Sequence, residues 1–334
     1  MMVNRNILVT GGLGYIGSNV VACLLSGGYS VIIVDNLVTG KKCRLDFLKI
    51  NGGDFVKFEK CDVRDEANLV EIILKYKIDA VIHLAGLKSV DESFEMATEY
   101  FSVNVGGAIS LMSAMNQANV FKLIFSSSAS IYGTPQSIPI DESHPINPES
   151  PYAVSKAVAE ELMRKSAGAD KRWSILALRY FNPIGAGFGG KLADEPSGEP
   201  PNLMPYLFRV AVGEYSKVKI FGDDYDTPDG TAIRDYIGVE DLARGHLAGL
   251  EFLENEKPEF WAINLGTGSG TSVLELLTAL EKVSGKEIPY VCVPRRKGDV
   301  SVSVASPTLA GKLLFWKAEL GLEQMCQSVW RQTN

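Results

Sequence analysis

The sequence contains no apolar run that approaches the roughly 18 residues needed to cross a bilayer. The apolar stretch near its start is short, lacks the pattern of a signal-peptide cleavage site and leads directly into a glycine-rich turn. We therefore expect neither a membrane span nor a secretory leader. Internal repeats and low-complexity tracts, which would indicate a solenoid or a linker, are also missing.

Histidine, cysteine and positive charge are scarce as well. The three histidines lack ligand spacing, which argues against a histidine-based metal site, and we expect no metal. The five cysteines include no close pair, which is typical of reduced thiols in a cytoplasmic protein. The net charge of −7 leaves no broad basic field, so nucleic acid is not an expected partner. The residues concerned are His83, His144, His246, Cys23, Cys43, Cys61, Cys292 and Cys326.

The sequence does contain a regular alternation of buried strands and helices. Its 334 residues, 46% of them hydrophobic, suffice for one large α/β domain with a smaller lobe. The alternation predicts a Rossmann-type, doubly wound parallel sheet with helices on both faces. The expected strands are residues 6–10, 30–35, 80–86, 123–128 and 175–180, and long helical stretches are expected at residues 95–118 and 151–167. Glycine, proline and acidic residues then dominate residues 183–202, which we expect to form an ordered loop over a cleft.

A glycine-rich turn follows the first expected strand. Gly11, Gly14 and Gly17 are spaced three apart, an apolar-striped helix follows them, and the next strand ends at Asp35. This order is typical of a dinucleotide-binding unit, in which glycines let the backbone approach the pyrophosphate at the helix N-terminus. An acid in this position accepts from ribose hydroxyls and repels a 2′-phosphate. The unit therefore predicts NAD rather than NADP.

Tyr152 and Lys156 are the pair that suggests catalysis. They would lie one turn apart on one face of a helix that Ser150 caps and Pro151 begins. An ammonium beside a phenol favours the phenolate and lowers its pKa, so the phenol can take a proton from a sugar hydroxyl. A lone pair with this spacing usually marks only an exposed helix surface. The glycine turn and Ser128, at the end of a strand where ligands bind, favour the catalytic interpretation.

Together these motifs are similar to those of the UDP-glucose 4-epimerases, a family of the extended short-chain dehydrogenase/reductase superfamily. The similarity runs almost from end to end and identifies the family better than it identifies the sugar. The matching segments are residues 10–18, 34–37, 83–88, 125–128, 178–183, 202–206, 220–225, 234–237 and 295–299.

The resemblance implies inversion at C4 of a hexose carried on UDP. Tyr152 would take the 4-hydroxyl proton, Lys156 would hold the phenol pKa low and bond the nicotinamide ribose, and Ser128 would bond the sugar oxygen. The sugar would pass through a transient 4-keto form and turn over while the pyrophosphate holds it in place. Binding energy would therefore concentrate on the nucleotide.

The resemblance also implies binding positions. Those for NAD are Gly11, Gly14, Tyr15, Ile16, Gly17, Asp35, Asn36, Asp62, Val63, Leu84, Ala85, Gly86, Lys88, Asn104, Tyr152, Lys156 and Tyr180. Those for the UDP-sugar are Lys88, Ser128, Tyr152, Asn182, Asn202, Leu203, Phe221, Arg234, Tyr236, Arg296, Asp299 and Ser303. Among the latter, the two arginines would bind the pyrophosphate, the aspartate the uridine ribose and the phenylalanine the uracil. Taken singly, each also fits a solvated surface charge, a turn or a cap.

The resemblance further implies two domains and a homodimer. Residues 1–181 would form the NAD-binding domain, to which residues 235–256 would return, and residues 182–334 would form the UDP-sugar-binding lobe. The family dimerises through two long helices, and the helical stretches at residues 95–118 and 151–167 have suitable length. Galactose metabolism and polysaccharide biosynthesis are both compatible settings.

The departures from the family pattern concern the sugar. Ser303 stands where epimerases strict for glucose and galactose commonly have tyrosine, four residues after the aspartate that matches Asp299. A small side chain there leaves room for an acetamido group, which predicts activity on UDP-GlcNAc and UDP-GalNAc as well. The alternative is that the loop shifts and fills the space, leaving an epimerase strict for UDP-Glc and UDP-Gal. Gly238 and Ser306 replace a usual histidine and aspartate, with no evident effect on the reaction.

Three rival functions fit the sequence less well. A nucleotide-sugar 4,6-dehydratase needs an Asp-Glu pair after the serine, but Ala129 and Ser130 occupy those positions. A UDP-sugar decarboxylase lacks its usual glutamate here. A non-catalytic NAD-binding sensor would typically have lost the tyrosine or the lysine, and this chain keeps both.

Overall fold

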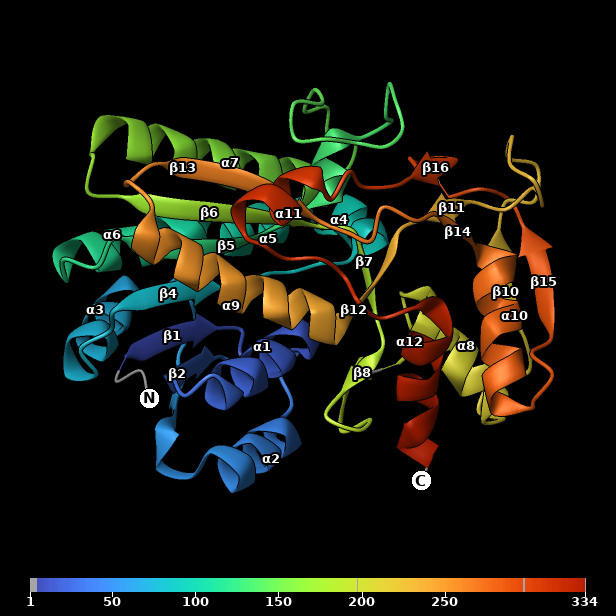
Figure 1. The fold of residues 1–334 in the computed structure, drawn as a ribbon, viewed down its shortest axis with the longest axis horizontal. Helices are drawn as coiled ribbons and strands as arrows, with labels where there is room; N and C mark the ends of the chain where they lie inside the picture. The colour runs from blue at the N-terminus through green and yellow to red at the C-terminus, as the bar shows by residue number, and fades with distance from the viewer. Residues whose placement is uncertain (1–4, 197, 297, 334) are drawn as a thin grey trace.

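The computed structural model describes residues 5–196, 198–296 and 298–333. Its centre is a seven-stranded sheet with the order β13-β6-β5-β4-β1-β2-β3, in which every pair of neighbours is parallel. The predicted Rossmann-type α/β fold is thus confirmed (Figure 1). The strands are β1 (Asn6–Thr10), β2 (Ser30–Asp35), β3 (Val56–Lys60), β4 (Ala80–His83), β5 (Lys122–Ser128), β6 (Ser174–Tyr180) and β13 (Phe260–Leu265).

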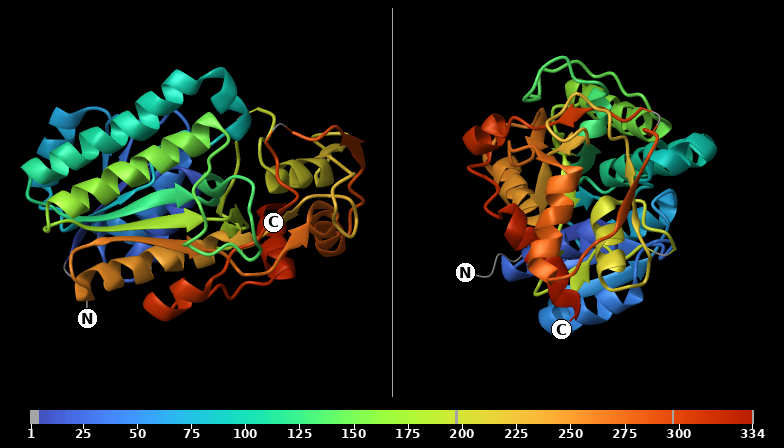
Figure 2. Two further views of the ribbon diagram at one scale, coloured as in Figure 1. Left: turned by 90° about the horizontal axis from the view of Figure 1, so that it is seen from above. Right: turned by 90° about the vertical axis from the view of Figure 1, so that its right-hand side faces the viewer.

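Helices cover both faces of this sheet because its strands are apolar on both sides. Along β1, Ile7 and Val9 belong to one hydrophobic cluster and Leu8 to the other. Figure 2 shows α6 and α7 on one face and α9 on the other. The first cluster includes α1 (Tyr15–Ser26), α2 (Lys42–Gly52), α9 (Val239–Asn255) and α11 (Thr308–Leu313), and the second includes α3 (Glu66–Lys75), α6 (Gly107–Gln117) and α7 (Pro151–Ala169).

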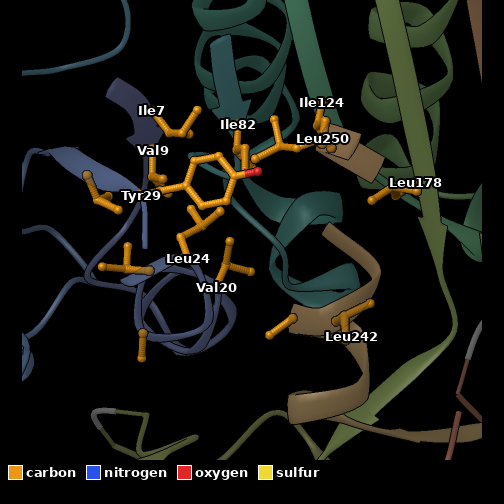
Figure 3. Packing of buried hydrophobic residues seen from close by; sticks show 14 of the residues in the cluster. Ile7, Val9, Val20, Leu24, Tyr29, Ile82, Ile124, Leu178, Leu242 and Leu250 are labelled. Carbon is orange, nitrogen blue, oxygen red and sulfur yellow. The ribbon is translucent and has the colours of Figure 1, made fainter. Parts of the chain in front are cut away.

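The packing of α1 and α9 against the sheet joins segments far apart in the chain (Figure 3). Val20 and Leu24 from α1 and Leu242 and Leu250 from α9 are fully or almost fully buried in the same cluster as Ile82 from β4. Each such side chain contributes about 1.5–3 kcal/mol by leaving water. The glycine turn therefore joins two elements, β1 and α1, that are both packed into this hydrophobic cluster.

The expected helical stretch over residues 95–118 is present, and it contains a wider π-helical turn. The chain forms α4 (Val90–Glu95), α5 (Ala97–Phe101), a π-helical turn at Ser102–Gly106 and then α6. Wide turns of this kind are frequent at functional sites, because they redirect side chains within a helix. Here the turn carries Asn104.

A second lobe with its own hydrophobic cluster lies beside the carboxyl ends of the strands (Figure 1). It contains α8 (Leu203–Ala211), α10 (Val273–Ser284), α12 (Leu322–Trp330), β10 (Val218–Phe221) and β15 (Tyr290–Val293). Short strands connect it to the sheet. β7 (Asn182–Ile184) pairs with β12 (Tyr236–Gly238), and β8 (Ala186–Gly187) pairs with β9 (Leu192–Ala193). β11 (Ile233–Arg234) pairs with both β14 (Thr271–Ser272) and β16 (Val302–Ser303). Single short turns lie at Gly53–Phe55, Ala129–Tyr132 and Arg331–Thr333.

The domain boundaries stay a prediction. α9 packs against α1, and β13 and α11 also join the sheet although they follow residue 256. Within the described ranges, no helix is both long enough and apolar enough to cross a membrane.

Two buried histidines predict how stability depends on pH. Burial lowers the pKa of His83 to about 3 and that of His246 to about 4, both below the usual 6.5. The unfolded chain therefore binds these two protons at higher pH than the folded chain, and the free energy of unfolding falls as pH drops below about 6.5. We expect a loss of about 2 kcal/mol per histidine between pH 6.5 and 5. Urea unfolding at both pH values should show a smaller loss for His83→Gln than for the wild type; equal losses would contradict this account.

Candidate active site

The glycine turn leaves no space for side chains where the dinucleotide motif requires close backbone approach. Gly11 has φ +68°, and a Cβ there would lie 2.6 Å from the amide nitrogen of Ala85. A Cβ on Gly17 would lie 2.1 Å from the carbonyl oxygen of Gly11. Gly14 caps the N-terminus of α1, where unpaired N–H groups attract anions. This cradle fits the pyrophosphate of NAD.

Asp35 stands at the end of β2, as predicted for the acid that selects NAD. It is 7% exposed, and its carboxylate accepts from the amides of Leu13 (3.0 Å) and Leu37 (2.8 Å). Burial raises its pKa, and these two bonds oppose the rise. The bonds tie the acid to the turn, so that an anionic oxygen faces the end of the strand and disfavours a 2′-phosphate there.

Three residues that the resemblance predicts to bind NAD follow β2 and β3, and they divide into two groups. Asn36 donates to Asp62 (3.1 Å), and the Arg64 guanidinium beside Asp62 holds the pKa of that carboxyl well below its usual range. Val63 is instead buried in the core against Gly107. Its side chain therefore packs, and only its backbone is left for contact with a cofactor.

On the opposite side of the turn, the end of β4 approaches α7. A Cβ on Gly86 would lie 2.8 Å from Asn104 Oδ1 and 3.6 Å from Lys156 Nζ. Asn104 accepts from the amide of Leu87 (2.8 Å) and donates to its carbonyl (3.1 Å) and to Ser155 Oγ (2.9 Å). Three segments predicted to bind NAD thus meet here. Leu84 and Ala85 are part of the same segment and pack against the two hydrophobic clusters.

The Ser-Tyr-Lys constellation assembles as its spacing predicts. Ser150 caps α7 by accepting from the amide of Ala153 (3.1 Å), and Pro151 begins the helix. Lys156 is 4% exposed and donates to the carbonyl oxygen of Ser126 (2.7 Å). A hydrogen bond joins Tyr152 to Ser128. The phenol, the ammonium and the serine hydroxyl therefore gather where β5 ends.

The expectation of a lowered tyrosine pKa is wrong for the protein as described. Tyr152 is half-buried as a residue, but its hydroxyl is enclosed, and burial raises the pKa of the phenol, with the Ser128 bond opposing the rise. Burial also lowers the pKa of Lys156 to about 8, with Glu160 opposing the fall. Because the ammonium bonds Ser126, it does not offset the burial of the phenol. An additional cation is needed before the phenolate is favoured.

Other predicted cofactor residues have their polar atoms engaged elsewhere. The Tyr15 hydroxyl donates to the carbonyl of Gly185 (2.7 Å), and the Tyr180 hydroxyl pairs with Nε2 of His246 (2.5 Å). Ile16 packs against the first hydrophobic cluster, the one that includes α1 and α9. These three side chains hold together the segments around the glycine turn. A cofactor could contact their backbone atoms and the faces of the two tyrosine rings.

The predicted pyrophosphate-binding cations each lie beside a carboxylate. Arg234 pairs with Asp299, and Arg296 Nε lies 3.6 Å from Asp91 and stacks 3.9 Å above the Phe221 ring. Lys88 lies 3.5 Å from Asp194, which also accepts from Asn202 Nδ2 (2.9 Å). These contacts form three groups, Arg234 with Asp299, Arg296 with Phe221, and Lys88 with Asn202 through Asp194, and they include two acids, Asp91 and Asp194, that the motifs did not indicate. The acidic character of residues 183–202 was the one signal for Asp194.

The remaining predicted substrate residues lie on short strands and at the start of α8. Ser303 is half-buried in β16 and pairs in register with Arg234 of β11. Tyr236 is 6% exposed on β12, and burial raises the pKa of its hydroxyl. Asn182 is exposed on β7 and donates its amide to the Asp235 carbonyl (2.9 Å), while Leu203 begins α8. Lys297, within the last matching segment, lies outside the described residues.

A metal centre is not among the features of this cleft. In residues 5–196, 198–296 and 298–333, no three His, Cys, Asp or Glu side chains come together in a way that could hold a metal ion. The chemistry that the site offers is proton transfer and electrostatic binding of phosphate. A glycine cradle, a buried acid at β2 and a Ser-Tyr-Lys group define a dinucleotide-dependent enzyme of the short-chain dehydrogenase/reductase class.

Comparisons with known proteins agree with this class. Residues 7–266 match the NAD dependent epimerase/dehydratase family. The UDP-glucose 4-epimerase of Mus musculus is 47% identical over 334 residues, which cover 98% of this chain and 96% of the mouse protein. The chain belongs to this NAD-dependent family and, within it, to the UDP-glucose 4-epimerases. This confirms the predicted family, enzyme class and cofactor.

Solved structures are similar along the whole chain. The UDP-glucose 4-epimerase from Bifidobacterium longum, in complex with NAD+ and UDP, has a TM-score of 0.95 and 45% identity, with 98% of each chain covered. The UDP-Glc/GlcNAc 4-epimerase from Campylobacter jejuni has a TM-score of 0.85 and 34% identity, covering 99% of this chain and 100% of the other.

The glycine cradle yields a testable prediction. In Gly17→Ala the new Cβ meets the Gly11 carbonyl at 2.1 Å, so the turn must open. We expect the purified variant to carry less than about a tenth of the NAD of the wild type, because the pyrophosphate loses its close backbone contact. Gly168→Ala is the control, since nothing lies within 4 Å of its Cβ. NAD released on denaturation gives the measure, and full retention by Gly17→Ala would rule out the cradle.

Proposed function

We propose that this protein interconverts UDP-Glc and UDP-Gal by inversion at C4 through a transient 4-keto sugar. The observation that carries the proposal is the placement of Tyr152, Lys156 and Ser128 together at the carboxyl end of β5, beside the glycine cradle. Membership of the UDP-glucose 4-epimerases supports it. Bound NAD would supply reversible hydride transfer at C4.

Tyr152 acts as the base and acid for the sugar 4-hydroxyl. Its pKa is raised by burial, so the phenol keeps its proton until positive charge accumulates beside it. Lys156 is charged at neutral pH, since its pKa of about 8 lies above 7. Ser128 bonds Tyr152 and is placed to carry a hydrogen bond between the phenol and the sugar oxygen. Tyr152 would therefore take the proton of the sugar only when the cofactor and substrate occupy the site.

The UDP portion is held by cations that carboxylates now neutralise. Arg234 and Arg296 would transfer their bonds from these acids to the pyrophosphate of UDP, whose oxygens can pair with a planar guanidinium, and Lys88 would transfer its bond to the pyrophosphate of NAD. Asp299, released from its arginine, would then accept from the uridine ribose. Phe221 would offer its ring to the uracil once Arg296 leaves it. Firm contacts on UDP leave the hexose free to turn over.

We further propose activity on UDP-GlcNAc and UDP-GalNAc. Ser303 is paired with Arg234, so its side chain lies beside the predicted phosphate site. A hydroxymethyl group occupies far less volume than a phenol, and the difference can accept an acetamido group. The likeness to the C. jejuni UDP-Glc/GlcNAc 4-epimerase supports this extension. Strict UDP-Glc/UDP-Gal epimerisation is the second candidate.

The domain division, the homodimer, the cytoplasmic location and the two possible pathways stay predictions. For the homodimer, support comes from exposed apolar side chains along the two helical stretches that carry it in the family. They are Phe101 on α5, Ile109 on α6 and Val158 on α7, exposed by 37%, 51% and 41%.

Tyr152→Phe tests the reaction. The variant removes one oxygen, and we expect kcat for UDP-Gal to fall about 10²- to 10⁴-fold, because proton transfer loses its base. NAD content should stay that of the wild type. Epimers are resolved by proton NMR without added NAD. Tyr290→Phe, at a half-exposed position on β15, is the matched control and should keep full activity. Unchanged turnover in Tyr152→Phe would remove the proposed role, and a wild type inactive on UDP-Gal and UDP-GalNAc would favour the sensor.

Ser303→Tyr tests the sugar range. If Ser303 lines the space for the acetamido group, the phenol should lower kcat/KM for UDP-GalNAc at least about tenfold, a loss of about 1.4 kcal/mol, and change UDP-Gal by less than about threefold. Ser137→Tyr makes the same substitution on an exposed loop and should alter neither. Wild-type protein that converts UDP-Gal but not UDP-GalNAc would establish the strict alternative.

A further inference from the structure

A buried carboxylate lies one helical turn beyond the catalytic lysine. Glu160 follows Lys156 by four residues on α7 and is 6% exposed. Its two oxygens accept from Arg179 Nε (3.1 Å) and Nη2 (2.7 Å), and one of them also accepts from Ser127 Oγ. Ser127 and Arg179 lie in segments that match the family, but the proposed mechanism gives none of these three residues a role.

The same arginine extends the contact to the other side of Ser128. Arg179 Nη1 donates to the Tyr132 hydroxyl (2.9 Å), which donates to Asn264 Oδ1 (2.7 Å) at the end of β13. Tyr132 closes the short turn that Ser128 begins. One hydrogen-bonded group therefore reaches from α7 through β5 and β6 to β13, all within the interior.

The position of Ser127 makes this group relevant to the reaction. The preceding residue, Ser126, supplies the carbonyl that Lys156 bonds, and the following residue, Ser128, bonds Tyr152. The bond from Ser127 to Glu160 thus fixes the strand to the helix between two contacts of the catalytic groups. A small shift here would change the Tyr152–Ser128 and Lys156–Ser126 distances together.

We propose that Glu160 is a positioning residue for the Ser-Tyr-Lys group: through Ser127 and Arg179 it fixes the end of β5 against α7 and supplies the buried negative charge that faces Lys156. The inference rests on the proposed function of those three residues. A merely stabilising role explains the arrangement less well, because a buried ion pair often adds no more stability than apolar residues of the same volume.

The charges around Lys156 come from every element packed against it. Tyr152 and Glu160 share its helix, His83 ends β4, and Arg179 and Tyr180 lie on β6. Burial keeps His83 neutral and raises the pKa of both phenols. Glu160 is the member of this set that can oppose the loss of the lysine proton.

Ser127→Ala tests the positioning. It removes the serine bond to Glu160 and leaves the ion pair, so we expect kcat for UDP-Gal to fall about 10- to 100-fold with KM changed less than twofold, as misplacement of catalytic groups predicts. Ser174→Ala is the matched control: Ser174 is 3% exposed on neighbouring β6, and its hydroxyl has no hydrogen-bond partner among the described residues. It should keep kcat within twofold.

Glu160→Gln tests the charge. Without the carboxylate the pKa of Lys156 should fall below about 8, so the alkaline limb of the kcat–pH profile should move to lower pH, whereas Ser127→Ala should leave that limb in place.

A Ser127→Ala variant as active as Ser174→Ala would overturn the proposal, as would an unmoved alkaline limb in a folded Glu160→Gln. If Glu160→Gln does not fold, Ser127→Ala alone decides. Failure of the proposed function is separate, because the wild type and Ser174→Ala would then be inactive too.

Discussion

The hydrogen bond from the Lys156 ammonium to the carbonyl oxygen of Ser126 sets the spacing on which the site depends. A buried ammonium must be bonded, and this bond spans the gap between α7 and the end of β5. Because Ser150 and Pro151 fix where α7 begins, Tyr152 lies in its first turn and Lys156 one turn later. Parallel strands end at a common edge, so the glycine cradle at β1 and the serines at β5 lie at the same edge of the sheet.

Features that depend on a few adjacent residues could be predicted from the sequence. The glycine turn, the cap at Ser150 and the acid at Asp35 each follow from a local pattern with one steric or electrostatic reason. The helical stretch over residues 95–118 follows from the sequence, but its π-helical turn at Ser102–Gly106 could not be predicted, because it is accompanied by bonds between Asn104 and both Leu87 and Ser155, which no local periodicity contains. The place of β13 beside β6 likewise depends on pairing across a long stretch of chain.

The ion pairs of the site likewise could not be predicted from local sequence patterns. Motifs identified the cations Lys88, Arg234 and Arg296, but the acid beside each lies far away in sequence; Lys88 and Asp194 are separated by 106 residues and Arg234 and Asp299 by 65. Pairs of this kind, partly open to solvent, contribute little to stability. In the proposed function their consequence would be for binding, since an incoming pyrophosphate would exchange these ionic bonds for bonds of its own.

The tyrosine shows why sequence spacing alone does not determine reactivity. Burial raises the pKa of the phenol, and the lysine one turn away is already bonded to Ser126, so the two residues by themselves favour a neutral tyrosine. Oxidised nicotinamide carries the positive charge that would shift this balance. If Tyr152 has the proposed role, its phenolate would be favoured when the cofactor is oxidised, which is the state that would accept a hydride from C4 of the sugar. The protonation state of Tyr152 and the redox state of the cofactor would then change together.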